Sequence, residues 1–401
     1  MKTRLITSAI LLIPIFAVLT SCNNKIQDST PQYLRGGNSI LSDGSDLVIA
    51  GYNSVKLKGY DAVLLKVNSS TGDTIWTKSF GASYSDAFFN VQRSNKAEGY
   101  IATGFSNNAN GGSPSMLIVK TDNNGKMLFS KTYGSGSYTE GFGIVPIADS
   151  GYLAVGFIQK SGTTNRDIFL ERIDYYGTEI WAKSIGAQGI HTNDSVNEVA
   201  YAAIAAPDSG YFITGAMKGV ANMQGSQIFL MKVSSDGDSV YWTKTFGTGF
   251  GYSLTLTKDG GIAVSGSILK GTDQNVFLLK TDLAGNLFTG WTAPIQYGGT
   301  GFEYGASMIE TSDGGYAITG ITESVTNGLQ DIYFVRTNSM GAITYEKNFG
   351  GANNDQGYGL IQASDNYFYI TGLSNSDGSY IYLNKLNAGN GQETGWPKLI
   401  Q

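Results

Sequence analysis

The stretch Asp313-Gly314-Gly315-Tyr316-Ala317-Ile318-Thr319-Gly320 combines a tight-turn sequence with an apolar run that ends on a glycine. The same ending recurs along the chain, at intervals from 51 residues (Gly215 to Gly266) to 59 residues (Gly156 to Gly215). The complete set of closing glycines is Gly51, Gly104, Gly156, Gly215, Gly266, Gly320 and Gly372. A regular period of about 50 residues is typical of propellers and solenoids.

Four runs in each repeat have the composition of short strands. In the sixth repeat they are residues 306–311, the run that closes at Gly320, residues 332–335, and a last run with Tyr345 and Lys347. The third run is apolar at successive positions, which suits a strand covered on both faces. A turn closing on glycine follows this third run, at Gly72, Gly125, Gly177, Gly237, Gly285, Gly341 and Gly389. Four strands in each of seven repeats, without helical periodicity, predict an all-β fold: a seven-bladed β-propeller of four-stranded antiparallel blades. A solenoid is the alternative, but it does not explain four strands per repeat.

The composition agrees with a turn-rich β protein, since the chain has 54 glycines, 7 prolines and only 15% charged residues. Two irregularities stand out. Residues 33–37 resemble residues 347–351, so this segment could add a strand to the last blade and help close the ring. Residues 290–294, with Pro294, replace the usual fourth strand of blade five and predict an edge bulge there.

The N-terminus has the pattern of an export signal. Lys2 and Arg4 precede an apolar stretch, residues 5–19, that is too short for a comfortable membrane span. The following Leu19-Thr20-Ser21-Cys22 resembles the bacterial lipobox, which implies cleavage before Cys22 and lipidation of Cys22. The expected domains are a signal peptide (1–21), a lipidated tether (22–32) and a single propeller (33–401). Cys22 is the only cysteine, so no intrachain disulfide can form. An outer-membrane location is expected by analogy, with its periplasmic or surface side left open.

The repeats resemble those of uncharacterised bacterial seven-bladed propeller lipoproteins, on units such as Phe349-Gly350-Gly351, Asp355, Asp365 and Tyr369-Ile370-Thr371-Gly372. This resemblance implies the architecture and says almost nothing about activity. The run from Thr71 to Trp76 also resembles a quinoprotein-type blade, in which the tryptophan docks between neighbouring blades. Such blades occur in quinone-dependent dehydrogenases and in the lipoprotein scaffold of outer-membrane barrel assembly.

Candidate binding residues come from the face that carries the second-to-third loops and the inter-blade connections, here called the loop face. Carboxylates enter first strands from this face at Asp86, Glu140, Glu198, Glu303 and Asp355. One interpretation is a carboxylate-lined mouth that binds a cation or performs acid–base chemistry on a glycan. The other is strand-end hydrogen bonding repeated by duplication, which the recurrence favours.

Three further features have structural and functional interpretations. A basic residue follows every third strand, at Lys66, Lys120, Arg172, Lys232, Lys280, Arg336 and Lys385, and its recurrence favours pairing with acids or packing on aromatics. First-strand aromatics pack between blades or stack sugars in the channel: Phe142, Tyr201, Tyr252 and Tyr358. The only histidine, His191, lies near Asp194 in an insertion and is a further candidate binding residue of the loop face. One histidine cannot form a multi-histidine metal site, and a solvated loop is favoured over a base–orienter pair of His191 with Asp194, because no nucleophile is evident. No metal, cofactor or catalytic residue is predicted.

Composition and motifs exclude several classes of function. The formal net charge of −5 and the lack of a basic block argue against a nucleic-acid partner. We find no nucleophile–base motif, metal cluster or phosphate loop in the sequence. The leading hypothesis is a membrane-anchored envelope lipoprotein that acts as a non-catalytic binding or scaffold propeller for a protein or glycan partner. The alternative is a carboxylate-dependent glycosidase or lyase acting on glycans. A third hypothesis is a structural spacer or assembly component, and a quinone dehydrogenase is less well supported.

Overall fold

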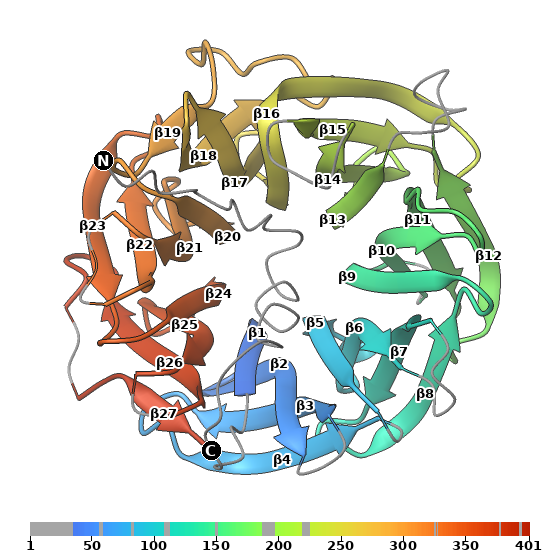
Figure 1. Ribbon diagram of the computed structural model, residues 1–401, viewed down its shortest axis with the longest axis horizontal. Helices are drawn as coiled ribbons and strands as arrows, with labels where there is room; N and C mark the ends of the chain where they lie inside the picture. The colour runs from blue at the N-terminus through green and yellow to red at the C-terminus, as the bar shows by residue number, and fades with distance from the viewer. Residues whose placement is uncertain are drawn as a thin grey trace, which may run out of the picture.

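The strands form a ring around a central axis (Figure 1). The computed structural model describes residues 35–55, 59–81, 84–107, 113–148, 151–186, 197–218, 225–324, 326, 328–376, 378–392 and 395–401. Within them the chain is almost entirely β, with one short 3-10 turn, η1 (Asn95–Ala97). No described helix is long and apolar enough to span a membrane. The predicted all-β propeller is confirmed, whereas the lipidation residue Cys22 and the insertion with His191 lie outside the described residues.

Each blade is an antiparallel meander that runs from the centre of the ring to its outer edge (Figure 1). The strands, blade by blade, are β1 (Arg35–Asp43), β2 (Asp46–Val55), β3 (Gly59–Asn68) and β4 (Thr74–Phe80); β5 (Asp86–Arg93), β6 (Tyr100–Ser106), β7 (Ser115–Thr121) and β8 (Met127–Tyr133); β9 (Tyr138–Pro146), β10 (Tyr152–Gln159), β11 (Asp167–Ile173) and β12 (Glu179–Ile185); β13 (Glu198–Ala205), β14 (Tyr211–Met217), β15 (Gln227–Val233) and the first part of β16 (Val240–Leu256); the second part of β16 with β17 (Ile262–Lys270), β18 (Asp273–Thr281) and β19 (Ile295–Tyr297); β20 (Glu303–Glu310), β21 (Tyr316–Thr322), β22 (Asp331–Thr337) and β23 (Ile343–Phe349); β24 (Asp355–Gln362), β25 (Tyr367–Ser374), β26 (Tyr380–Asn387) and β27 (Lys398–Ile400).

Strand β16 belongs to two blades because the chain passes from blade four to blade five without leaving the extended conformation. Thr248 still pairs with Gln227 of β15, whereas Gly249 pairs with Ile268 of β17. The register therefore divides the described strands into seven four-stranded units.

A β-bulge occurs at the same place in the innermost strand of every blade. The extra residue is Asn38, Phe89, Phe142, Tyr201, Tyr252, Ala306 or Tyr358. The closing glycine of the sequence repeat lies opposite each bulge. A Cβ atom on Gly320 would lie 1.6 Å from the Tyr304 carbonyl oxygen, and the other six closing glycines show distances of 1.8 to 2.0 Å. The glycine is needed because the bulge pushes a backbone carbonyl into the space of a side chain.

Adjacent blades are joined by an aromatic side chain from the outer strand, which packs on a turn glycine of the next blade. A Cβ on Gly125 would lie 2.9 Å from the Trp76 ring, and one on Gly237 would lie 2.9 Å from the Trp181 ring. This confirms that the tryptophan docks between blades. In blade seven the glycine that receives Tyr345 is Gly391, and not the predicted Gly389.

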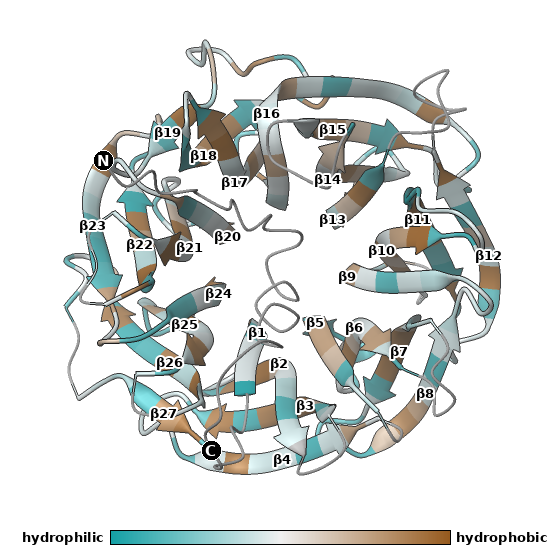
Figure 2. Ribbon diagram, in the orientation of Figure 1, coloured by the Kyte–Doolittle hydropathy of each residue, from teal (hydrophilic) through white to brown (hydrophobic). Residues whose placement is uncertain are grey.

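The apolar cores lie mainly between blades. One core combines Leu153 and Val155 of blade three with Ile213 and Phe229 of blade four. Figure 2 shows the apolar segments along the strands, while the loops are mostly hydrophilic. Because each face of a blade packs on a neighbour, the ring is stabilised by interfaces that repeat around the axis.

Within the described residues, the ring closes through side chains and without exchange of a strand. Described residues 35–37 begin β1, and blade seven contains only β24 to β27, so this part of the N-terminal segment adds no strand to the last blade. The seam between blades one and seven has its own apolar core, with Ile49 and Leu383. Across it the Tyr369 hydroxyl donates a hydrogen bond to the Ser69 carbonyl at 3.0 Å.

The outer strand of blade five is shortened, and it does not carry the predicted bulge. Strand β19 begins at Ile295, directly after Pro294, and pairs with only three residues of β18. Trp291 is nevertheless buried and lies 3.1 Å from the Cβ position of Gly341 in blade six. The interface therefore keeps its aromatic anchor although the strand is interrupted.

Candidate functional site: the central cavity and its rim

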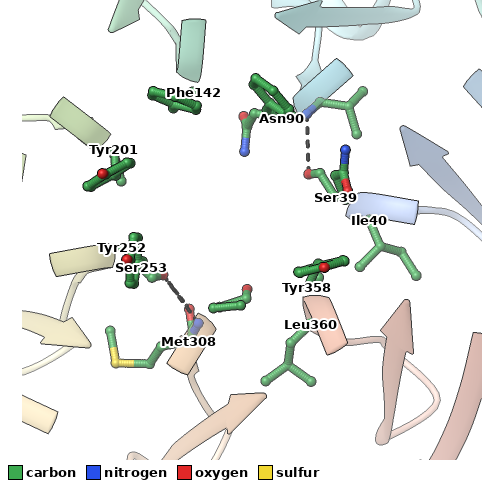
Figure 3. A pocket seen from close by; sticks show the side chains of 18 of the residues that line it. Ser39, Ile40, Asn90, Phe142, Tyr201, Tyr252, Ser253, Met308, Tyr358 and Leu360 are labelled. Atoms are coloured by element: carbon green, nitrogen blue, oxygen red, sulfur yellow. Dashed lines mark hydrogen bonds between the residues drawn. The ribbon is translucent and has the colours of Figure 1, made fainter. Parts of the chain in front are cut away.

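A cavity of about 410 Å³ lies on the axis, lined by the innermost strands of all seven blades (Figure 3). This volume is within the usual range for small-molecule sites. Figure 3 shows Phe142, Tyr201, Tyr252 and Tyr358 standing around the open centre, each from a different blade. The bulges explain this arrangement, because they place one extra side chain per blade at the axis.

We call the rings of Phe89, Phe142, Tyr201, Tyr252, Tyr304 and Tyr358 the aromatic belt. Consecutive ring centroids from Phe89 to Phe142, Tyr201, Tyr252 and Tyr304 are separated by 5.2, 5.3, 4.8 and 4.4 Å. The bulge residue is small in two blades, at Asn38 and Ala306. The sequence indicated the aromatics at bulge positions as candidates for packing between blades or for stacking on sugars. In the structure their rings pack on one another, and stacking on a sugar stays a prediction.

The cavity lining is neutral. Among the described residues that line it, none is an aspartate, glutamate, lysine, arginine or histidine. Burial raises the pKa of Tyr252, Tyr304 and Tyr358 well above the usual value for a phenol, so these hydroxyls stay protonated. The polar lining groups include the amides of Asn90 and Gln92 and the hydroxyls of Ser253 and Ser307. The cavity can therefore donate and accept hydrogen bonds without fixed charge.

Three of the five predicted carboxylates are buried at the first residue of an innermost strand, where they bind the loop arriving from the preceding blade. Asp355 accepts hydrogen bonds from the Gly351 amide at 2.8 Å and the Ser376 hydroxyl at 2.6 Å. Glu303 accepts from the Gly299 amide at 3.0 Å and the Thr322 hydroxyl at 2.9 Å. Asp86 packs so closely on Gly81 that a Cβ there would lie 2.2 Å from its carboxylate.

Glu140 does not occupy the position of the other four. In blade two, Asp86 pairs with Ser106, two residues beyond the closing glycine Gly104. Glu140 pairs with Phe157, only one residue beyond the closing glycine Gly156 of its own blade. Thr139 takes the place of Asp86, and its hydroxyl donates to the Tyr133 carbonyl at 2.9 Å. Grouping Glu140 with the other carboxylates was therefore wrong by one residue. Counting back from the closing glycine and its bulge would have revealed the shift.

Glu140 is a buried acid near the loop-face end of β9. The Tyr138 hydroxyl donates to its carboxylate at 2.6 Å. Burial raises the Glu140 pKa to about 6, although the bond from Tyr138 and the charge of Arg166 oppose this shift. The guanidinium of Arg166 lies 4.3 Å from the centre of the Phe157 ring. Among the described residues, this acid–tyrosine–arginine group is found in one blade only.

Glu198, the fifth predicted carboxylate, is fully buried at the start of β13. Neither of its carboxylate oxygens has a hydrogen-bond partner in the described part of the chain. Burial, together with the nearby charge of Asp167, raises its pKa to about 8. The structure thus places the five acids on separate blades and outside the cavity lining, and ligand binding by them stays a prediction.

The basic residues after the third strands have a structural role in most blades, as their recurrence indicated. Lys66 pairs with Asp43 at 2.8 Å, Arg336 with Asp313 at 2.5 Å, and Lys385 with Asp365 at 3.0 Å. Lys120 differs, because its ammonium lies 2.8 Å from the centre of the Tyr175 ring. Burial lowers the Lys120 pKa to about 8.

Glu171 was not identified from the sequence, although its position carries a signal. The residue directly before the basic residue is apolar in five other blades: Leu65, Val119, Met231, Leu279 and Val335. Glu171 is fully buried, and neither carboxylate oxygen has a partner among the described residues. Burial, and to a smaller extent Glu179, raises its pKa to about 8.

This carboxyl predicts a pH-dependent stability. Folding raises the Glu171 pKa from 4.5 to about 8, so the folded protein keeps a proton that the unfolded chain has lost between these values. The free energy of unfolding should fall as pH rises through this window, by up to about 1.4 kcal/mol per pH unit. Glu171→Leu should reduce this slope and raise the free energy of unfolding at pH 9 by about 2 kcal/mol.

Denaturant unfolding at pH 5, 7 and 9 measures the effect. Glu198 has a pKa shift in the same direction, so part of the slope should remain in the variant. Glu323→Leu, which removes an exposed carboxylate, is the control and should keep the wild-type slope. An unchanged slope in Glu171→Leu would show that this carboxyl is not protonated in the fold.

Comparison with known proteins supports the architecture. No protein-family model and no curated protein matches the sequence. The quinohemoprotein alcohol dehydrogenase from Comamonas testosteroni is similar with a TM-score of 0.52 and 9% identity, over 90% of this chain and 67% of that chain. Sqt1 from Chaetomium thermophilum has a TM-score of 0.54 and 10% identity, over 90% and 98% of the two chains. The polysaccharide lyase Uly1 has a TM-score of 0.53 and 13% identity, over 92% and 94%. At such identities the likeness shows the β-propeller fold alone.

Proposed function

We propose that this protein is a membrane-anchored envelope lipoprotein whose propeller binds a protein or glycan partner without catalysing a reaction. The observation that carries the proposal is the neutral lining of the cavity, which among the described residues contains no aspartate, glutamate, lysine, arginine or histidine. Serine and tyrosine hydroxyls do line the cavity, but as nucleophiles or proton carriers they ordinarily need such a group beside them to accept or shift a proton. A rigid ring with a neutral central cavity is instead suited to recognition.

The rim supports the same proposal. Described carboxylates such as Asp355 and Glu303 are buried and bind backbone amides and hydroxyls of their own loops. Within the described residues, no three histidine, cysteine, aspartate or glutamate side chains are close enough together to hold a metal ion. In this proposal the buried carboxylates stabilise the loops of the loop face and do not bind a ligand.

A carboxylate-dependent glycosidase or lyase is the second candidate, and Glu140 is the observation in its favour. Its pKa of about 6 and its contact with the Tyr138 hydroxyl suit a group that exchanges protons near neutral pH. The test is turnover of a panel of envelope polysaccharides by the full-length protein, followed by detection of reducing ends and unsaturated products. We expect no turnover. Turnover that is lost in Glu140→Gln and kept in Glu346→Gln would replace the binding proposal with the enzyme.

The membrane anchor gives a separate prediction at Cys22. Cys22→Ser should abolish incorporation of a labelled fatty acid and move the protein from the membrane fraction to the soluble envelope fraction. Stable anchoring needs more than one acyl chain, and in this proposal all of the acyl chains are attached to Cys22. Asn24→Ser, two residues away, is the matched control and should remain lipidated. Membrane retention of Cys22→Ser at the wild-type level would contradict the anchor.

The side of the membrane decides where partners are sought. An epitope tag after Gln401, with antibody labelling of intact and permeabilised cells, measures it. Labelling of intact cells would place the propeller at the surface and direct the search to glycans and surface proteins. Labelling only after permeabilisation would place it in the periplasm, where crosslinking in living cells would identify a protein partner.

A further inference from the structure

Part of the aromatic belt is accessible from within the cavity. Tyr252 and Tyr304 line the cavity, are only partly buried and lie 4.4 Å apart between ring centroids. The bulge residue next to them in blade six is Ala306, which leaves room beside the two rings. A molecule in the cavity would therefore meet tyrosine surfaces on the side of blades five and six, where Figure 3 shows Tyr252.

Accessible hydrogen-bonding groups lie on other parts of the wall. Asn90 and Gln92 of blade two line the cavity and are partly exposed, as is Ser307 of blade six. The Gln92 amide donates to the Asn90 carbonyl oxygen at 3.3 Å. Amides and hydroxyls both donate and accept, which is the chemistry needed to bind alcohol groups.

Two buried side-chain oxygens in residues of the lining have no hydrogen-bond partner in the described part of the chain. They are the Tyr201 hydroxyl and the side-chain amide oxygen (Oδ1) of Asn38. The orientation of Asn38 is set, because its amide nitrogen donates to the Phe88 carbonyl at 2.7 Å. Both oxygens are shielded from solvent, so a molecule in the cavity would meet the rest of these side chains and not the two oxygens themselves. The groups that a ligand can reach are therefore the partly exposed ones, Asn90, Gln92 and Ser307.

We propose that the central cavity binds a neutral sugar residue, which stacks on Tyr252 and Tyr304 and places its hydroxyls against Asn90, Gln92 and Ser307. This inference rests on the proposed binding function and names its ligand class. A sugar ring has apolar C–H faces and a hydroxylated edge, so it matches a wall of aromatic rings and uncharged polar groups. A charged ligand would lose its hydration without gaining a counter-charge from the lining.

The probe is an array of neutral and uronate-containing oligosaccharides, applied to the full-length lipoprotein in detergent, with affinities then measured by titration calorimetry. We expect binding of neutral glycans and none of uronate-containing ones. Tyr252→Ala should weaken binding about tenfold or more through loss of the stacking surface. Tyr241→Ala is its matched control, because Tyr241 lies on the same strand β16 with 60% of its surface exposed, away from the cavity.

A conservative pair covers the case in which Tyr252→Ala does not fold. Ser307→Ala removes one hydroxyl that lines the cavity and is partly exposed, and it should weaken binding about fivefold. Tyr316→Phe removes a buried hydroxyl that lies outside the cavity, so affinity should not change. The proposal is overturned if no neutral glycan binds, if uronate-containing glycans bind equally well, or if the control variants lose as much affinity as Tyr252→Ala and Ser307→Ala.

Failure of this inference can be distinguished from failure of the proposed function. If crosslinking in cells captures a protein partner equally with the wild type and Tyr252→Ala, and no neutral glycan binds, the sugar proposal fails while the binding function stands. If the full-length protein converts a bound glycan into products, the non-catalytic function fails, although sugar binding in the cavity is supported.

Discussion

Substitution of Gly320 by alanine should unfold blade six or prevent the protein from accumulating in folded form. A Cβ atom at this position would lie 1.6 Å from the backbone carbonyl oxygen of Tyr304, and a backbone atom cannot move aside as a side chain can. Relief of this overlap requires removal of the bulge in β20, which also displaces Tyr304 and Ala306 at the cavity. We expect a loss of at least about 3 kcal/mol in the free energy of unfolding, in the upper range for single substitutions.

The measurement is thermal and denaturant unfolding of the purified variant beside Gly314→Ala in the same blade. Gly314 has a φ of +82°, but no atom lies within 4 Å of its Cβ position. Its substitution should therefore cost only about 1 kcal/mol, from the left-handed backbone. Equal stability of the two variants would show that the bulge opposite Gly320 is not the reason why a glycine recurs at this position of the repeat.

The second large effect is expected at the seam of the ring. Trp396→Ala removes the aromatic ring that packs on Gly72 of blade one, where a Cβ would lie 3.1 Å from the indole. No strand crosses this junction in the described structure, so side-chain contacts alone join blades one and seven. We expect a loss of about 2–3 kcal/mol, since Trp396 is half-buried, and faster amide exchange in β1 to β4 and β24 to β27.

Trp76→Ala is the matched control, because Trp76 makes the same contact with Gly125 at a junction that the chain itself bridges. It should lower the melting temperature by a similar amount, while blades one and seven keep their wild-type exchange. Hydrogen exchange with mass spectrometry on both variants measures the difference. The same exchange pattern in the two variants would mean that the seam is no weaker than the other junctions.

The candidate site shows how far sequence reasoning reaches. Phe142, Tyr201, Tyr252 and Tyr358 could be recognised because they recur at one position of the repeat, and the structure places all four in the aromatic belt. Tyr304 was missed because it lies two residues before the bulge position of its blade, which is occupied by Ala306. Glu140 was misplaced by one residue because the carboxylates were grouped by composition: it lies two residues before its bulge residue, Phe142, whereas the other four acids lie three residues before theirs.

The repeat itself could be read from the sequence because it depends on local rules. Alternation of apolar runs with turns and the closing glycines, of which Gly320 is one, are requirements that each blade satisfies separately, and they determined the β-propeller class. The resemblance of residues 19–22 to a lipobox is likewise a local pattern. Only the tertiary structure decided that the lining of the axis is neutral, that Asp355 and Glu303 bind their own loops, and that Trp396 closes the ring on Gly72. These properties depend on residues from different blades, whose relative positions follow from the packing of the whole ring and from no single segment.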